Sequence, residues 1–146
     1  FFERYRGYAA ALQQAGLSAD PALQVDAITT EQDGHAAMQT LLHRDAGVDA
    51  VFGASDLIAI GAMRAIQESG LTVPDDIAVA GFDNIPMANF VSPGLTTVLQ
   101  DTKQAGDLLV RTLIHQINGE EVASSMLPAR LIIRRSCRAL SQPAGD

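Results

Sequence analysis

Two pairs of small polar residues follow short apolar runs and carry the side chains best suited to chemistry. Ser55 and Asp56 come after the run 48–53, and Asp83 and Asn84 come after the run 77–82. A helical pattern separates the two runs, which is typical of a βαβ unit with parallel strands. Ligands of open α/β sheets bind outside the carboxyl ends of the strands. The sequence therefore predicts a ligand site on one rim that carries all four residues.

Arg4 supplies donors that complement the carboxylate of Asp83. A guanidinium offers a planar fork of N–H groups, and a carboxylate offers two acceptor oxygens. Together they can bind adjacent hydroxyl groups of a polar ligand. A purely structural interpretation stays open, in which Ser55 caps the helix that begins at Asp56 and Asp83 caps the next turn.

Patterns typical of enzymes and metal sites are missing from the sequence. The segment Gly53-Ala54-Ser55-Asp56-Leu57 lacks the second glycine of a nucleophile elbow, and no Gly-x-Gly-x-x-Gly loop occurs. His35 and His43 lie two turns apart on one predicted helix, and a single cysteine cannot form a zinc site. We expect no catalytic residue, no metal and no cofactor.

Hydrophobic periodicity and capping residues predict the elements that position this rim. Helices are expected over about 3–15, 30–43, 56–69 and 101–117, with one further helical turn at 85–90. Strands are expected over 23–28, 48–53, 77–82, 95–99 and 127–133. The alternating order predicts an α/β fold, a doubly wound and mostly parallel sheet with helices on both faces.

Composition narrows the classes of partner. The chain has 146 residues, 47% of them apolar, and a formal net charge of −7. The only adjacent basic pair is Arg134-Arg135, so these residues carry no footprint for nucleic acid or an anionic membrane. No stretch approaches the roughly 20 apolar residues of a membrane span. Cys137 alone fits a reducing compartment, and we expect a cytoplasmic protein. The missing initiator methionine suggests a fragment.

Several motifs occur together in a fixed order. An aspartate opens the helix at Asp56, G-A-M-R-A follows at 61–65, and V-P-D-D-I occupies 73–77. G-F-D-N stands at 81–84, and L-T-T-V-L-Q-D at 95–101. The combination resembles the effector-binding part of LacI/GalR-type transcription repressors, and the resemblance extends from Arg4 to about Arg134.

The resemblance implies a domain layout. The fold would be one lobe of a periplasmic-binding-protein-like type I domain, incomplete at its N-terminus. Residues 1–98 would form the C-terminal lobe, and 99–119 the crossing strand end with a helix that packs on the other lobe. Residues 120–138 would return as a strand segment, and 139–146 would be a tail.

The resemblance also implies roles for single residues. Arg4 lies in R-x-x-G-Y, where the family places an effector-binding arginine, and Asp83 matches the ligand-binding aspartate of G-[FY]-D. Thr29 stands where many relatives have an aromatic that stacks on a sugar ring. The expected effector-binding residues are Arg4, Ser55, Asp83, Thr29, Phe82 and Gln100, although Phe82 equally suits the core. The expected dimer interface comprises Leu57, Met87, Ala88 and Phe90, although that segment equally suits intramolecular packing.

The function implied by the resemblance is effector sensing and dimerisation in a regulator. A small polar molecule, a sugar or a derivative, would change operator affinity, and DNA would be bound only through a headpiece that these residues do not contain. The alternative is a periplasmic sugar-binding protein of a transport system, which would share the fold and the cleft but bind no DNA.

Overall fold

The structure is a computed structural model that describes residues 2–44 and 47–138. The predicted tail 139–146 lies outside the described residues. None of the described helices is long and apolar enough to cross a membrane. The helices are α1 (Phe2–Gln14), α2 (Glu31–His43), α3 (Asp56–Glu68), α4 (Met87–Phe90) and α5 (Thr102–Ile117). The strands are β1 (Ala50–Phe52), β2 (Ala78–Ala80), β3 (Thr97–Leu99) and β4 (Arg130–Ile132).

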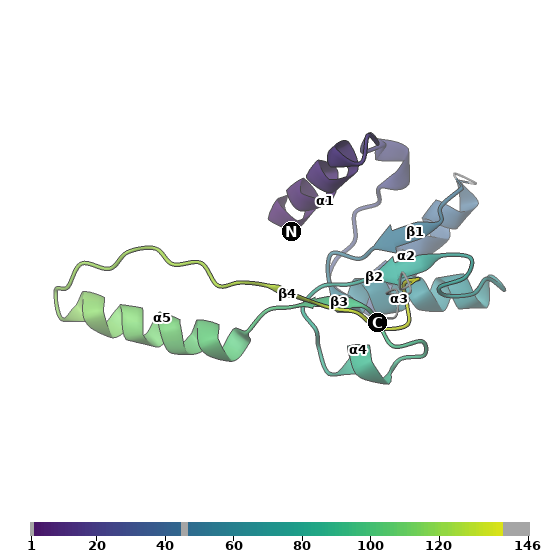
Figure 1. Ribbon diagram of the computed structural model, residues 1–146. Helices are drawn as coiled ribbons and strands as arrows, with labels where there is room; N and C mark the ends of the chain where they lie inside the picture. Colours follow the sequence, from purple (N-terminus) through teal and green to yellow (C-terminus); the bar gives the residue numbers. More distant parts are fainter. Residues whose placement is uncertain (1, 45–46, 139–146) are drawn as a thin grey trace, which may run out of the picture.

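The sheet is mostly parallel, as the sequence predicts. β1 pairs in parallel with β2, and Val51 lies opposite Val79. Parallel bridges join Ala80 to Thr96 and Asp83 to Leu99, which places β3 beside β2. β4 pairs antiparallel with β3 and closes the order β1-β2-β3-β4 (Figure 1). The α/β prediction is confirmed.

The predicted strand at 23–28 is wrong. Residues Pro21–Leu23 form a 3-10 turn that Asp20 caps, with the Ala22 N–H donating to Asp20 Oδ1 at 2.8 Å. Residues 24–28 carry no strand assignment and pair with no strand of the described chain. A strand requires hydrogen bonds to a neighbour, and no such neighbour lies beside this segment. Instead a cavity of about 690 Å³ separates it from β1 and α1.

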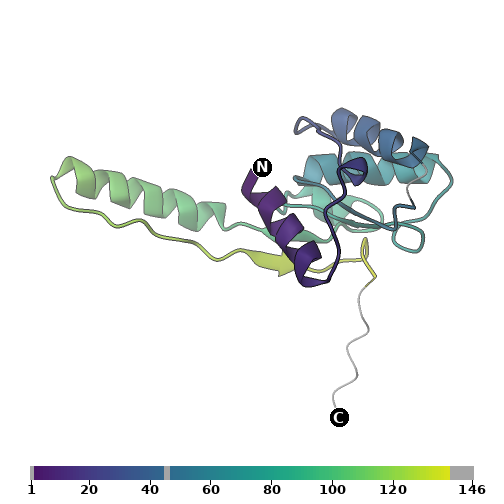
Figure 2. The same ribbon diagram turned by 90° about the horizontal axis from the view of Figure 1, so that it is seen from above.

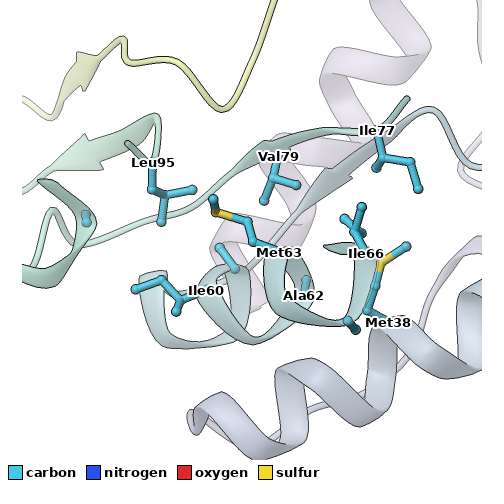
Figure 3. Close-up of a cluster of buried hydrophobic side chains, with 11 residues drawn as sticks. Met38, Ile60, Ala62, Met63, Ile66, Ile77, Val79 and Leu95 are labelled. Atoms are coloured by element: carbon cyan, nitrogen blue, oxygen red, sulfur yellow. The ribbon is translucent and has the colours of Figure 1, made fainter. Parts of the chain in front are cut away.

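Helix α3 is the centre of the hydrophobic core. Ser55 caps its start, and Gly70 follows its end with φ of +80°, a conformation that glycine adopts without strain. Its buried face packs against the sheet on one side and α2 on the other (Figure 3). The core side chains labelled there are Met38, Ile60, Ala62, Met63, Ile66, Ile77, Val79 and Leu95.

Two glycines allow α2 and α3 to approach closely. A Cβ atom built on Gly61 would lie 2.0 Å from the carbonyl oxygen of Glu31, and one on Gly34 would lie 2.3 Å from that of Ile58. Neither carbonyl can move without its helix. The contact between the two helices therefore depends on the absence of both side chains.

Helix α5 leaves the body of the molecule. With the segment that follows it, α5 forms an arm that projects beyond β3 and β4 (Figures 1 and 2). Asp101 caps the helix as predicted, accepting the Gln104 N–H at 2.8 Å. The wide apolar face that the sequence predicts is exposed here. Its most exposed large side chains are Leu109, Val110, Leu113, Ile114 and Ile117.

Replacing Gly61 by alanine is expected to destabilise the chain by about 3 kcal/mol, because the new methyl group overpacks the contact between α2 and α3. Gly106→Ala is the control, since a Cβ there meets nothing within 4 Å. In helix α5 that change should be neutral or stabilise by up to about 1 kcal/mol. Urea unfolding measures both, and an unchanged midpoint for Gly61→Ala would contradict the close-packing argument.

Candidate functional site

Arg4 and Asp83 meet across 79 positions of sequence. Arg4 Nη2 donates to Asp83 Oδ1 at 2.9 Å, and Nη1 donates to the carbonyl oxygen of Ala54 at 2.5 Å. Helix α1 brings the arginine to the carboxyl ends of β1 and β2, where the rim was predicted. The two side chains keep 22% and 34% of their surface exposed, so solvent reaches the pair.

Asp83 and Asn84 form a turn of unusual backbone geometry at the end of β2. Their φ angles are 112° and 52°, in the region that side chains other than glycine seldom adopt. Such conformations cost on the order of 1–3 kcal/mol each and persist only when neighbouring groups hold them. The turn directs the Asp83 carboxylate toward Arg4 and toward Gln100, whose Nε2 donates to Oδ1 at 3.3 Å.

Phe82 forms the floor under the arginine. The guanidinium carbon of Arg4 lies 3.9 Å from the centre of the Phe82 ring, a cation–π contact. Both line a cavity of about 460 Å³, together with Glu3, Gly7, Tyr8, Phe52 and Val98. The site thus combines an aromatic surface with charged donors and acceptors, the surroundings that polar ring compounds such as sugars require.

Ser55 and Thr29 lie apart from this cluster. The Ser55 side chain accepts the Ile58 N–H at 3.4 Å as the cap of α3, and the residue is 1% exposed. The backbone of the preceding residue, Ala54, is what contacts Arg4. Thr29 is exposed in the bend before α2 and does not line either cavity described above. The capping interpretation therefore describes Ser55 here, and effector contact by both residues stays a prediction.

One residue of the expected dimer interface is misplaced. Ala88 is fully buried in the core, because α4 turns this face toward Leu95, whose N–H donates to the Ala88 carbonyl at 2.8 Å. Met87 and Phe90, on the other face, are 47% and 83% exposed. Leu57 is partly exposed on α3. The prediction for Ala88 is wrong as a surface contact, whereas the exposed faces of the other three are available to a partner.

Asp56 is the residue whose importance the sequence did not reveal. Its carboxylate accepts hydrogen bonds from Thr97 Oγ1 at 2.5 Å and from the Ile85 N–H at 2.8 Å. Burial raises the pKa of this carboxyl; the two hydrogen bonds oppose the rise, and the Asp83 charge adds to it. An aspartate at a helix start is ordinary in sequence, so no local signal distinguishes a buried one.

Arg134 completes the polar network behind the turn. Its guanidinium donates to Asn84 Oδ1 at 2.8 Å and to the Leu95 carbonyl at 2.7 Å. Sequence analysis noted this arginine only as half of a basic pair. Its position next to β3 comes from the antiparallel return of β4, which local sequence does not specify.

The histidines lie away from the rim. His35 Nε2 and Glu68 Oε2 are 2.7 Å apart between α2 and α3, and His43 and His115 are exposed. Within residues 2–44 and 47–138, no three side chains of the metal-binding types gather into a possible metal site.

Comparison with known proteins identifies the family. The profile of the periplasmic binding protein-like domain matches residues 2–137. The chain belongs to this family. It is 38% identical over 138 residues to the HTH-type transcriptional repressor PurR of Pasteurella multocida, covering 93% of this chain and 41% of the relative.

Solved structures agree with the sequence relatives. A transcriptional regulator CelR–cellobiose complex superposes with a TM-score of 0.88 at 39% identity, covering 92% of this chain and 42% of that chain. A sugar-binding regulator of the LacI family from Escherichia coli, complexed with phosphate, gives a TM-score of 0.85 at 32% identity. It covers 92% of this chain and 49% of that chain.

These findings confirm the resemblance to the effector-binding domain of LacI-type regulators, and with it the periplasmic-binding-protein-like fold. The chain spans less than half of the length of the proteins it matches. The matched relatives are transcription regulators rather than enzymes.

Replacing Arg4 by methionine is expected to loosen α1, because this helix buries no residue of its own and Arg4 joins it to Ala54 and Asp83. Loss of about 1 kcal/mol corresponds to roughly fivefold faster amide exchange in α1. Arg6→Met is the control, since Arg6 pairs with Glu3 within the helix. Hydrogen exchange read by mass spectrometry makes the measurement, and equal rates in the two variants would show that Arg4 does not anchor α1.

Proposed function

We propose that this chain is the effector-sensing part of a LacI-type DNA-binding transcription regulator, and that its effector is a sugar or a sugar derivative. The observation that carries the proposal is the cluster of Arg4, Asp83 and Gln100 beside the cavity over Phe82. A hydroxyl group both donates and accepts hydrogen bonds, so neighbouring hydroxyls can be held by a guanidinium and a carboxylate together. The aromatic floor suits the apolar face of a sugar ring.

The cellobiose bound to CelR supports the choice of effector class, because that complex shares the fold at 39% identity. In this chain Thr29 takes the place expected for a stacking aromatic, and Phe82 supplies the nearest ring to Arg4. The structure offers hydroxyl recognition through charged groups, which derivatives and disaccharides share. Which member of the class binds is decided by titration.

The mechanism we infer is a shift between two arrangements of two lobes. The effector would bind between this lobe and another lobe, and its higher affinity for one arrangement would change the population of the two. The exposed apolar face of α5 would then be covered by the other lobe. Operator DNA would be bound through a headpiece outside these residues, in the cytoplasm, since the described lobe carries a net negative composition.

Homodimerisation would use the outer face of α4. Met87 and Phe90 expose apolar side chains there, and Leu57 is partly exposed at the start of α3. A second copy would cover these side chains and hold two headpieces at the spacing of operator half-sites. No catalytic step is part of the proposed function.

Asp83→Ala in the complete regulator is expected to weaken sugar binding roughly 10- to 100-fold and to abolish effector release from operator, while operator affinity itself stays unchanged. The reason is the loss of charge-assisted hydrogen bonds, worth about 1.5–3 kcal/mol. Calorimetric titration with cellobiose and a panel of mono- and disaccharides measures binding, and gel-shift titration measures DNA affinity.

The matched control is Asp107→Ala, which removes an exposed aspartate from α5. It should bind sugar as the unaltered protein does. An unchanged effector response in Asp83→Ala would remove this residue from the site. A signal peptide in place of a helix-turn-helix segment upstream in the gene would favour the transport-receptor alternative.

A further inference from the structure

Asp56 makes contacts that its place at a helix start does not require. The residue is fully buried, and Ser55 already caps α3. Its two carboxylate oxygens accept hydrogen bonds from outside the helix, one from Thr97 on β3 and one from the Ile85 N–H after the strained turn. Its own N–H donates to the Phe82 carbonyl at 2.8 Å. One residue therefore joins α3, β3 and both ends of the turn at 83–84.

The surroundings leave room for this carboxylate and little else. A Cβ atom built on Gly81 would lie 2.4 Å from Asp56 Oδ1, so the carboxylate occupies the space beside the glycine. Thr97 Oγ1, which donates to Asp56, also accepts the Asn84 N–H at 3.3 Å. The hydroxyl can play both parts only while an acceptor on Asp56 takes its proton.

We propose that Asp56 is a positioning residue of the effector site, whose buried carboxylate fixes the turn at 83–84 so that Asp83 points at Arg4 and the cavity over Phe82. This inference rests on the proposed function for its consequence in binding, and on the geometry alone for its structural part. Asp56 itself does not touch the cavity lining. Its effect passes through Ile85 and Thr97.

The physical reason lies in the balance between strain and hydrogen bonding. Two consecutive residues with positive φ store free energy that relaxes once the contacts that hold them are lost. Burying a carboxylate is costly unless its oxygens are bonded, and the raised pKa reflects that cost. Without Asp56, the Ile85 N–H and the Thr97 hydroxyl lose their acceptor in a buried space, so the turn is expected to change conformation.

The alternative is that Asp56 only stabilises the lobe. Ser136 provides the matched control, because it too is fully buried and its hydroxyl joins two strands. Ser136 Oγ donates to the Val79 carbonyl at 2.6 Å and accepts the Thr96 N–H at 2.8 Å. It makes as many bonds as the Asp56 carboxylate but does not contact the turn.

The experiment compares Asp56→Ala, Asp56→Asn and Ser136→Ala in the complete regulator. An asparagine can accept from Ile85 and donate to Thr97, so it keeps both contacts without the charge. We expect Asp56→Ala to lose at least tenfold in affinity for whichever panel sugar the unaltered protein binds. Asp56→Asn should restore most of that loss, and Ser136→Ala should bind normally despite a lowered melting temperature.

Crystal structures of the same variants test the geometry without any ligand. The 2.9 Å contact between Arg4 and Asp83 should survive in Ser136→Ala and Asp56→Asn and be absent in Asp56→Ala. If Asp56→Ala does not fold, Thr97→Val removes one of the two bonds and should give the same change in part.

Each outcome bears on a separate claim. An Asp56→Ala protein that keeps the contact between Arg4 and Asp83 and binds sugar like Ser136→Ala would overturn the positioning role. If the unaltered regulator binds none of the sugars, the proposed function fails. The crystal structures would then still decide whether Asp56 holds the turn.

Discussion

Parallel pairing of β1 with β2 is the constraint on which the site depends. In a parallel pair the carboxyl ends of both strands emerge at one edge, and the register of Val51 opposite Val79 fixes which residues meet there. The Ala54 carbonyl and the Asp83 carboxylate thus come within reach of one guanidinium. A slip of one residue would turn every side chain of a strand to the opposite face, removing Val79 from the core. The hydrophobic core and the polar rim are therefore set by the same register.

Helix α3 transmits this constraint to the rest of the lobe. Its inner face fills the core against the sheet, while Gly61 and Gly34 let α2 pack closely on its outer side. Its first residue, Asp56, bonds to β3 and to the turn after β2. Apolar packing and a buried polar network thus meet on one helix, and the rigid part of the lobe lies directly behind the residues that face the cavity.

Two apolar surfaces remain uncovered in this chain. One is the cavity between residues 24–28 and β1, and the other is the outward face of α5. Apolar surfaces of this extent are seldom exposed to water in a working protein. The matched relatives are more than twice as long as the chain, so other segments are there to cover the corresponding surfaces in them. In this chain the uncovered surfaces explain why the periodic pattern at 23–28 did not become a strand.

The sequence by itself determined the local structure and the direction of the site. Capping residues marked helix starts at Thr30, Ser55 and Asp101, because a cap bonds within three residues of its own position. Motif order led to the family, and strand ends led to Asp83 as a partner of Arg4. Tertiary structure decided what depends on distant neighbours. It withheld a partner from residues 24–28, turned Ala88 inward, left Ser55 as a buried cap, and placed Thr97 and Arg134 behind the turn. Burial and strand pairing are properties of contacts across tens of residues, which periodicity within one segment cannot specify.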